Sequence, residues 1–338
     1  MGMKGSGHGK LLLFGEHAAV YGYPALGVAL PETVELEIEH DSHWGLANVP
    51  GKFREILSPV LERLDAHLRE RYGSDAAARA RGSVRFHQIV PTGLGLGSSA
   101  ALCVALARAA LSTVPQVQRH CTEECDHEVW ALANELERIF HGSPSGIDTG
   151  LATLGGALSF HFEGPGLPRA AALPLPPGII VAGATPRSSN TKTLVGALKE
   201  RVQQRESRVL RELADLGEIA EEATRLVMGS GDPGEDQGDL VRSLGGLSTR
   251  AHRLLRDLGL STDPTEQCLE TALDKGALGG KISGAGGGGA FFAIFDDPAA
   301  ALETAGTLRE ILSGIDRDLP VRVIRAEDEA LQLVEAAS

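Results

Sequence analysis

The sequence is poor in cysteine and in basic residues, and each shortage excludes a class of protein. Its four cysteines are too few and too scattered for a secreted disulfide framework. They are Cys103, Cys121, Cys125 and Cys268. Lys and Arg number 32 against 45 Asp and Glu, and the resulting net charge of −13 argues against binding to nucleic acid or acidic membranes. We therefore expect reduced thiols and no nucleic-acid partner.

Long apolar runs are also missing. Runs such as 10–14 and 290–295 are far shorter than the 18 or so residues that a membrane helix needs. The amino-terminal apolar stretch is interrupted by Gly15 and Glu16, so the core of a signal peptide is absent. These features predict a cytoplasmic protein without a membrane span. At 42% hydrophobic and 23% charged residues, the 338 residues are expected to fold as about two domains.

Glycine is abundant: 42 of 338 residues is about 12%, against a typical value of about 7%. The glycines gather in four clusters, at 5–15, 93–97, 142–156 and 279–289. Because glycine has no Cβ, the backbone can turn sharply or approach a ligand closely at such places. Four clusters in one chain indicate a phosphate site.

Hydrophobic periodicity predicts alternating strands and helices in the first half of the chain. Strands are expected at 10–14, 34–39, 84–90 and 157–162, a helix from Ser99 to about Leu111, and a second helix opening at Thr122. The second helix carries one apolar stripe, made of Cys125, Val129, Leu132, Leu136 and Ile139.

A proline-rich segment at 174–178 marks the expected domain boundary, which gives domains 1–177 and 178–338. Beyond it we expect a strand at 179–184, helices over about 191–228, 239–258 and 263–276, a helix from Pro298 and a strand near 321–325. Asp263, Pro264 and Glu266 suggest a capping residue, a first-turn proline and a third-position acid for the helix that begins there. The chain is therefore predicted to be α/β in its first half and α+β in its second.

The strongest local motif is a glycine loop that runs directly into an apolar helix. Helix amino termini attract phosphate, because their N–H groups lack acceptors and the helix dipole is positive there. The residues that we expect to bind nucleotide are Gly93, Leu94, Gly95, Leu96, Gly97, Ser98, Ser99 and Ala100. A plain glycine turn with a serine N-cap is the alternative.

Known nucleotide fingerprints do not fit. A Walker loop around Lys10 would need Gly at 4 and Ser or Thr at 11, where Lys4 and Leu11 stand. Gly284, Gly286 and Gly289 follow the dinucleotide pattern, but the apolar residues after them predict a strand rather than the required helix.

Two further groups of polar residues are candidates for chemistry. Asp148 stands at a loop-to-helix junction eleven residues after Glu137, although its spacing from Ser145 also suits a capping box. Glu16 and His17 follow a strand directly and could hydrogen-bond a substrate, although a lone histidine is more often structural. The metal-capable side chains at 120–127 match no zinc spacing, so no metal site is expected there.

Three segments resemble, in the same order, the three motifs of the GHMP kinase superfamily. They are Gly9–Gly22, Pro91–Ala101 and Lys281–Gly289. The first segment and His141–Asp148 are similar to those of the mevalonate kinases within that superfamily. The resemblance implies an amino-terminal domain of the ribosomal-protein S5 domain 2-like type and a carboxy-terminal ferredoxin-like domain.

Carried over residue by residue, the resemblance implies a set of roles. Asp148 matches the catalytic aspartate and Lys10 the lysine near it. Ser99 and Glu137 match the Mg²⁺ ligands, with Ser98 second for the hydroxyl, and Glu16 and His17 match substrate-side residues. Two departures stand out: Gly7-His8 replaces the common Ala-Pro, and no Arg directly precedes Asn190-Thr191, so that Arg187 or Lys192 would take over that role.

The expected activity is ATP-dependent phosphorylation of mevalonate on its primary hydroxyl, in isoprenoid biosynthesis, with Mg²⁺ as cofactor. Its expected partners are the small molecules ATP and mevalonate, and a homodimer is compatible with the resemblance. Two alternatives stay open: a kinase of the same superfamily acting on phosphomevalonate, homoserine or a sugar, and a non-catalytic ATP-binding regulator.

Overall fold

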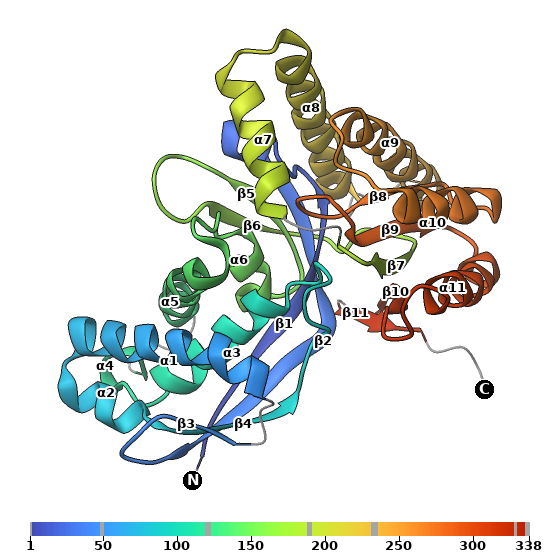
Figure 1. Cartoon of the computed structure of the whole chain (residues 1–338). Helices are drawn as coiled ribbons and strands as arrows, with labels where there is room; N and C mark the ends of the chain where they lie inside the picture. Colours follow the sequence, from blue (N-terminus) through green and yellow to red (C-terminus); the bar gives the residue numbers. More distant parts are fainter. Residues whose placement is uncertain are drawn as a thin grey trace. The chain divides into compact units, whose positions relative to one another are not determined.

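The computed structural model describes residues 2–47, 51–118, 123–187, 191–230, 236–327 and 330–334, which pack into two compact units (Figure 1). Unit 1 comprises Met1–Lys10, Glu32–Thr92 and Gly97–Gly155, and unit 2 comprises Leu11–Pro31, Gly93–Leu96 and Gly156–Ser338. Neither unit is continuous in sequence. The long strands β1 (Met3–Phe14) and β2 (Ala25–His40), which pair with each other, each run from one unit into the other.

In unit 1, the second half of β2 pairs antiparallel with β4 (Gly82–Gln88), and β4 pairs in parallel with β3 (Gly45–Ala47). Along β2 the buried Val34, Leu36 and Ile38 alternate with glutamates that are exposed or half-buried. The strand predicted from the period of two at 34–39 is therefore confirmed.

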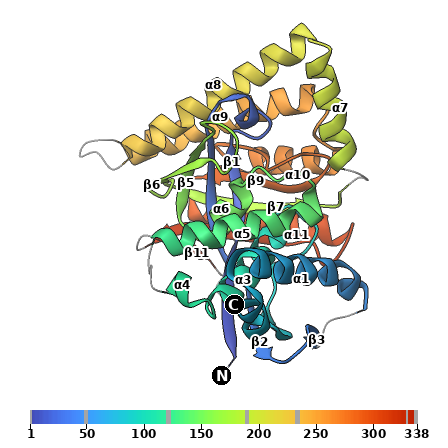
Figure 2. The same ribbon diagram turned by 90° about the vertical axis from the view of Figure 1, so that its left-hand side faces the viewer.

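The described helices of unit 1 are α1 (Gly51–Tyr72), α2 (Ser74–Ala80), α3 (Ser98–Leu111), α4 (Pro115–Gln118), α5 (Glu123–His141) and α6 (Ile147–Leu154). Helix α3 is rich in alanine and almost wholly buried, and it contacts α2, α5 and α6. Figure 2 shows α1, α3 and α5 near one another, and α5 contacts both of the others. β1 approaches α3 so closely that a Cβ on Gly5 would lie 1.9 Å from the carbonyl oxygen of Ala105. Glycine at the start of β1 thus brings the strand against the helix.

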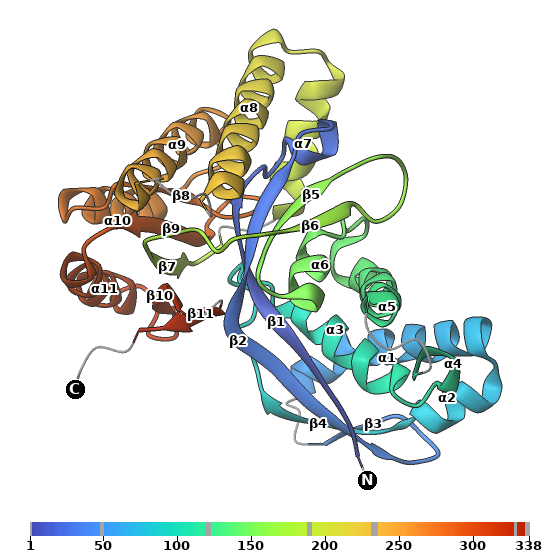
Figure 3. The same cartoon turned by 180° about the vertical axis from the view of Figure 1, so that it is seen from behind.

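Unit 2 contains an antiparallel sheet in the order β11-β10-β7-β9-β8. Its strands are β7 (Ile179–Thr185), β8 (Gly279–Ile282), β9 (Gly289–Phe295), β10 (Val321–Glu327) and β11 (Ala330–Leu333). Its helices are α7 (Thr191–Gln203), α8 (Ser207–Gly229), α9 (Gln237–Asp257), α10 (Asp263–Asp274) and α11 (Pro298–Ser313). Helix α9 contacts β8 and β9, and α8 packs beside α9 (Figure 3).

The remaining part of unit 2 is a smaller antiparallel arrangement and a short turn. The first half of β2 pairs with β5 (Ala157–His161), and β5 pairs with β6 (Arg169–Leu173). Between β1 and β2 lies the 3₁₀ turn η1 (Ala19–Tyr21).

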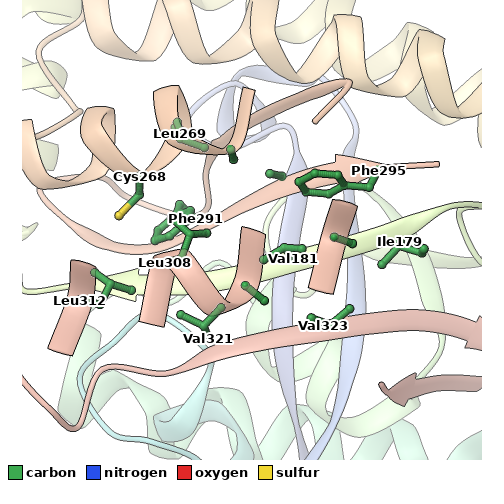
Figure 4. Close-up of a cluster of buried hydrophobic side chains, with 14 residues drawn as sticks. Ile179, Val181, Cys268, Leu269, Phe291, Phe295, Leu308, Leu312, Val321 and Val323 are labelled. Carbon is green, nitrogen blue, oxygen red and sulfur yellow. The ribbon is translucent and has the colours of Figure 1, made fainter. Parts of the chain in front are cut away.

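A cluster of buried apolar side chains in unit 2 lies between its sheet and the helices α10 and α11 (Figure 4). Phe291 and Phe295 of β9 meet Leu269 of α10 and Leu308 of α11 in this cluster. Cys268 is buried in the same cluster, and burial raises the pKa of its thiol to about 11. The α+β character expected for the second half of the chain follows from this packing.

Most of the predicted elements are confirmed, with two corrections. The helical stretch expected over 191–228 is two helices, because the chain turns at Gln204–Glu206, where Arg205 has a φ of 55°. Helix α10 has Thr262 as its N-cap, so Asp263 is a first-turn residue and not the cap. The expected opening of α5 at Thr122 lies outside the described residues, and α5 is described from Glu123.

The segment after the fourth glycine cluster is strand β9, so the rejection of a dinucleotide loop there is confirmed. In the described part of the chain, no helix combines the length and apolar character that crossing a membrane requires.

Candidate active site

Lys10 and Asp148 form an ion pair in unit 1, with 3.1 Å between Lys10 Nζ and Asp148 Oδ2. Lys10 is buried on β1, whereas the side chain of Asp148 is 39% exposed at the first turn of α6. The N-cap of α6 is Gly146, and the N–H of Ile147 in the first turn donates to the hydroxyl of Ser145 at 3.3 Å. Asp148 therefore does not cap the helix: its carboxylate faces a lysine and remains accessible to a substrate.

Gly97 explains how Lys10 reaches this position. Its φ is +81°, and a Cβ placed on it would lie 2.6 Å from Lys10 Cγ. The aliphatic part of Lys10 thus passes directly against the amino terminus of α3. A side chain at 97 would be strained twice, by the left-handed backbone and by the contact with Lys10.

The amino terminus of α3 has no side-chain cap. Gly97 is its N-cap residue, and no side chain accepts a hydrogen bond from the first turn. The alternative of a serine N-cap is therefore wrong. The hydroxyl of Ser99 instead donates to Glu137 Oε1 at 3.1 Å, and it lies 3.2 Å from His141 Nε2. First-turn N–H groups of a helix have no acceptor within the helix, so an anion would satisfy them here.

Glu137 of unit 1 is buried, with only 2% of its surface exposed, and its Oε2 has no hydrogen-bond partner among the described residues. Burial, and then the negative charge of Asp148, raise the pKa of Glu137 to about 8, against the opposing effects of Ser99 and Lys10. The buried face of α5 differs from the predicted stripe at one end, since Ile139 is 38% exposed while Glu137 points inward.

Ser99 and Glu137 fit a magnesium ion. Both offer oxygen donors, which Mg²⁺ prefers, and the unpartnered Oε2 of Glu137 lacks the counter-charge that a cation would supply. Mg²⁺ commonly uses one or two protein groups and takes its other ligands from water and substrate phosphates. In the described part of the chain, no group of three or more His, Cys, Asp or Glu side chains is arranged to hold a metal. A two-residue site completed by a nucleotide is consistent with that finding.

Glu135, two residues earlier on α5, belongs to a different cluster. Its carboxylate accepts hydrogen bonds from Arg63 Nε at 2.9 Å and lies 2.7 Å from His67 Nδ1. Together these contacts lower the pKa of Glu135 in spite of its partial burial. Glu135 is thus engaged by two basic side chains and is a poor alternative to Glu137 as a metal ligand.

His17 of unit 2 adopts the left-handed region with a φ of 64°, and its Nε2 is buried without a hydrogen-bond partner. Burial lowers the pKa of His17 to about 4. A hydrogen bond with the backbone of Ala285 opposes this shift, and the positive charge of Lys281 adds to it. The ring is therefore neutral near pH 7. A neutral imidazole with one unpartnered nitrogen is suited to hydrogen-bond a ligand.

Glu16 forms a buried ion pair with Lys281 in unit 2. The exposed fractions of the two side chains are 3% and 0%, and the ammonium also donates to the carbonyl oxygen of Ile282 at 2.8 Å. Lys281 lies within the third motif, but no role for it was predicted from the sequence. A lysine within a buried strand needs an acidic partner, so the position of Lys281 in an apolar strand could have predicted an ion pair. A direct contact of Glu16 with a substrate stays a prediction.

Ser283 was also missed, and it joins the third motif to β1 within unit 2. Its hydroxyl accepts a hydrogen bond from the N–H of Leu12 at 3.0 Å and donates one to the carbonyl oxygen of Leu12 at 2.9 Å. This double hydrogen bond fixes the turn after β8 on the strand that leads to Glu16 and His17.

The residues 93–96 of the glycine loop lie against the third motif in unit 2. A Cβ on Gly289 would lie 3.3 Å from the carbonyl oxygen of Leu94, and one on Gly95 would lie 3.1 Å from the amide nitrogen of Ala290. The guanidinium of Arg187 would be 3.2 Å from the same Gly95 Cβ. Arg187 and Lys192 were the two candidates to replace the arginine that the family has directly before Asn-Thr. Arg187 lies over these glycines. The residues Ser188–Asn190 and the side chain of Lys192 lie outside the described residues.

The metal-capable segment at 120–127 shows no metal arrangement among its described residues. Cys125 Sγ lies 3.0 Å from the carbonyl oxygen of Val117 and donates to it. His120 and Cys121 lie outside the described residues.

Comparisons with known proteins agree with these motifs. Residues 59–156 match the family described as "GHMP kinases N terminal domain" and residues 237–313 the one described as "GHMP kinases C terminal". Mevalonate kinase of Thermococcus onnurineus is 31% identical over 324 residues, covering 88% of this chain and 91% of its own length. Mevalonate kinase of Pyrococcus horikoshii is 30% identical over 355 residues, covering 97% and 96%. The crystal structure of L. major mevalonate kinase in complex with R-mevalonate shares the fold, with a TM-score of 0.74, 24% identity and 96% of each chain covered.

Proposed function

This chain belongs to the GHMP kinase family, and on that basis we propose that it transfers the γ-phosphoryl group of ATP to the primary hydroxyl of mevalonate, giving 5-phosphomevalonate. The relatives that match most of its length are mevalonate kinases, which supports mevalonate over phosphomevalonate, homoserine or a sugar as the acceptor.

The single observation that carries the proposal is the ion pair of Lys10 and Asp148. Phosphoryl transfer passes through a loose transition state, so it depends on alignment and charge neutralisation. The half-exposed Asp148 carboxylate accepts or orients the proton of the acceptor hydroxyl, and the buried Lys10 ammonium offsets negative charge on the transferred group. A non-catalytic ATP-binding regulator has no need of this pair.

The nucleotide side of the proposal rests on the uncapped start of α3 and on Ser99 and Glu137. The first-turn amides of α3 bind phosphate oxygens of ATP, as at other helix amino termini. A magnesium ion held by Ser99 and Glu137 would neutralise charge on the β- and γ-phosphate oxygens. Ser98, which precedes Ser99 in the same turn, is the second candidate for the hydroxyl ligand.

The acceptor side of the proposal rests on His17. Its neutral ring presents an unpartnered nitrogen that can hydrogen-bond a hydroxyl or a carboxylate of mevalonate. We propose that Glu16, through its ion pair with Lys281, holds the backbone that carries His17.

The domain boundary at 177/178 is part of the proposal. The described strands β1–β6 precede it and β7–β11 follow it, which supports this division, although the compact units are interleaved in sequence. A cytoplasmic location and a homodimer stay predictions, and light scattering on the purified protein tests the second.

An assay of ADP release with a panel of acceptors tests the function. We expect release that depends on both Mg²⁺ and mevalonate, with 5-phosphomevalonate as the product by mass spectrometry. Phosphomevalonate, homoserine and galactose, each added in place of mevalonate, should give a much smaller kcat/KM. A larger kcat/KM with one of them would reassign the acceptor, and ATP binding without turnover on any acceptor would support the regulator.

A further inference from the structure

The aromatic ring of Tyr23 lies directly on the backbone of helix α8. A Cβ on Gly217 would lie 2.2 Å from Tyr23 Cγ and 2.3 Å from Cδ1. Gly217 is buried in the middle of α8, where glycine costs roughly 1 kcal/mol relative to alanine. The glycine leaves space that the tyrosine ring occupies.

Tyr23 ends a short loop, residues 15–24, whose two ends touch each other. A Cβ on Gly15, which has a φ of +91°, would lie 2.3 Å from the carbonyl oxygen of Pro24. Within the loop, the N–H of Ala19 donates to the carbonyl oxygen of Gly15 at 3.0 Å. A displacement of Tyr23 therefore moves Pro24 and, through it, the backbone around Gly15.

The same loop carries Glu16 and His17, which attach it to the third motif. Glu16 pairs with Lys281, and the ring of His17 is hydrogen-bonded with the backbone of Ala285. The loop thus has two attachments within unit 2, one to β8 and the turn after it and one to α8. Figures 2 and 3 show the dark-blue turn that contains η1 beside α8.

We propose that Tyr23 and Gly217 are positioning residues for acceptor binding: the ring seated on α8 fixes the loop 15–24, so that His17 keeps the backbone conformation in which its Nε2 can meet the acceptor. The proposal rests on the role that the proposed function gives to His17. Neither residue touches the acceptor itself.

The test is Gly217→Ala, with Gly246→Ala as its matched control. Gly246 lies inside α9, where an added Cβ meets nothing within 4 Å. In Gly217→Ala we expect the KM for mevalonate to rise on the order of 10-fold, because misplacement by about 1 Å can be costly in rate. The KM for ATP should change less than about twofold, and Gly246→Ala should change neither constant.

Tyr23→Ala completes the test, because it removes the ring and adds no atoms. We expect it to raise the KM for mevalonate as well, and the double variant should equal Tyr23→Ala alone, since the added methyl then has nothing to displace. Additive effects of the two substitutions would overturn the proposal. If Gly217→Ala fails to fold, Tyr23→Ala against wild type carries the test.

The titration of the His17 ring by NMR separates this proposal from the proposed function, because it needs no substrate. In Gly217→Ala the pKa of His17 should rise from about 4 toward its ordinary value of 6.5 as the ring becomes hydrated. An unchanged titration together with an unchanged KM for mevalonate would overturn the proposal. A shifted titration in a protein that does not phosphorylate mevalonate would leave the contact established and reject the function.

Discussion

The two carboxylates of the candidate site in unit 1 have different surroundings, which assign them different work. Asp148 is half-exposed and pairs with a lysine, whereas Glu137 is buried beside a hydroxyl and keeps one oxygen unpartnered. An accessible carboxylate can exchange a proton with a substrate. A buried one with spare lone pairs is suited to bind a cation.

Asp148→Asn should lower kcat by on the order of 10²-fold or more, the usual contribution of a general base. The amide keeps the shape of the side chain but cannot accept the proton. Steady-state kinetics with mevalonate checks this, and a fluorescent ATP analogue should bind as in wild type. Asp126→Asn, at a surface carboxylate of α5 paired with Arg108, is the control. Near-normal turnover of Asp148→Asn would remove its catalytic role.

Glu137→Gln should raise the Mg²⁺ concentration needed for half-maximal activity, because it removes the anionic ligand and leaves the neighbouring Ser99 in place. The measurement is a Mg²⁺ titration at saturating ATP. Glu135→Gln provides a matched control on the same helix, since that carboxylate binds Arg63 and His67 instead. Equal Mg²⁺ requirements in the two variants would contradict the assignment.

His17→Asn should lower kcat/KM for mevalonate strongly while the affinity for ATP stays within a few-fold. Asparagine tolerates the left-handed backbone, so the loss reflects the ring and not the conformation. When a site is built to hydrogen-bond a polar substrate, loss of that hydrogen bond leaves a polar group unpaired and lowers kcat/KM strongly. Arg205→Asn, at the other described non-glycine residue with positive φ, is the control. Loss of ATP affinity with unaltered mevalonate saturation would place His17 on the nucleotide side.

At the level of elements, the start of α3 and the strand β1 depend on each other through glycine. Gly5 and Gly7 bring β1 against the helix backbone, and Gly97 lets the stem of Lys10 pass the helix start. The glycine cluster therefore serves packing as well as phosphate binding.

Gly97→Ala should lower kcat on the order of 10-fold or more, because the new methyl displaces the stem of Lys10 from the helix start. The matched control is Gly259→Ala, which has a similar positive φ of 83° but no atom within 4 Å of the added Cβ. Both variants pay roughly 1–3 kcal/mol of backbone strain, measurable by urea denaturation. Equal kcat in the two would show that the contact with Lys10 is unimportant.

Local periodicity predicted most elements but not those whose signals are weak or absent. The strand at 34–39 and helix α3 follow their apolar patterns closely. Helix α1 was missed, since it is polar on average and contains Pro59. The break between α7 and α8 could not be predicted, because no glycine or proline stands there. Arg205 adopts the positive φ at this turn instead. The position of Ser99 at the start of a helix suggested an N-cap. The sequence does not show that the Ser99 hydroxyl hydrogen-bonds Glu137 instead.

At the scale of the whole molecule, unit 2 is closed by contacts between segments that lie far apart in sequence. Leu12 meets Ser283 and Glu16 meets Lys281, at separations of 271 and 265 residues. No local pattern states which buried lysine meets which acid. The motifs identified these segments, and the contacts between them had to come from the structure.

Lys281→Met should lower the free energy of unfolding by about 3–5 kcal/mol, because it removes the ammonium partner of a buried carboxylate, that of Glu16. Urea denaturation measures this. Combining it with Glu16→Met should recover a large part of the loss, since the pair is then replaced by apolar side chains. Lys275→Met, which breaks the exposed pair with Glu303, should cost about 0–1 kcal/mol. If Lys281→Met and Lys275→Met lowered the free energy of unfolding equally, burial would not be what makes the Lys281 pair important.

The interleaving of unit 2 also sets the order of events during synthesis on the ribosome. Glu16 emerges 265 residues ahead of Lys281, which corresponds to a delay of about 13 to 53 s at roughly 5–20 residues per second. Throughout that interval the carboxylate must stay hydrated, and Leu12 has no Ser283 to bind. The segment 11–31 is therefore translated early and becomes fixed late, so translation must already have passed Ser283 when the loop 15–24 takes its final conformation.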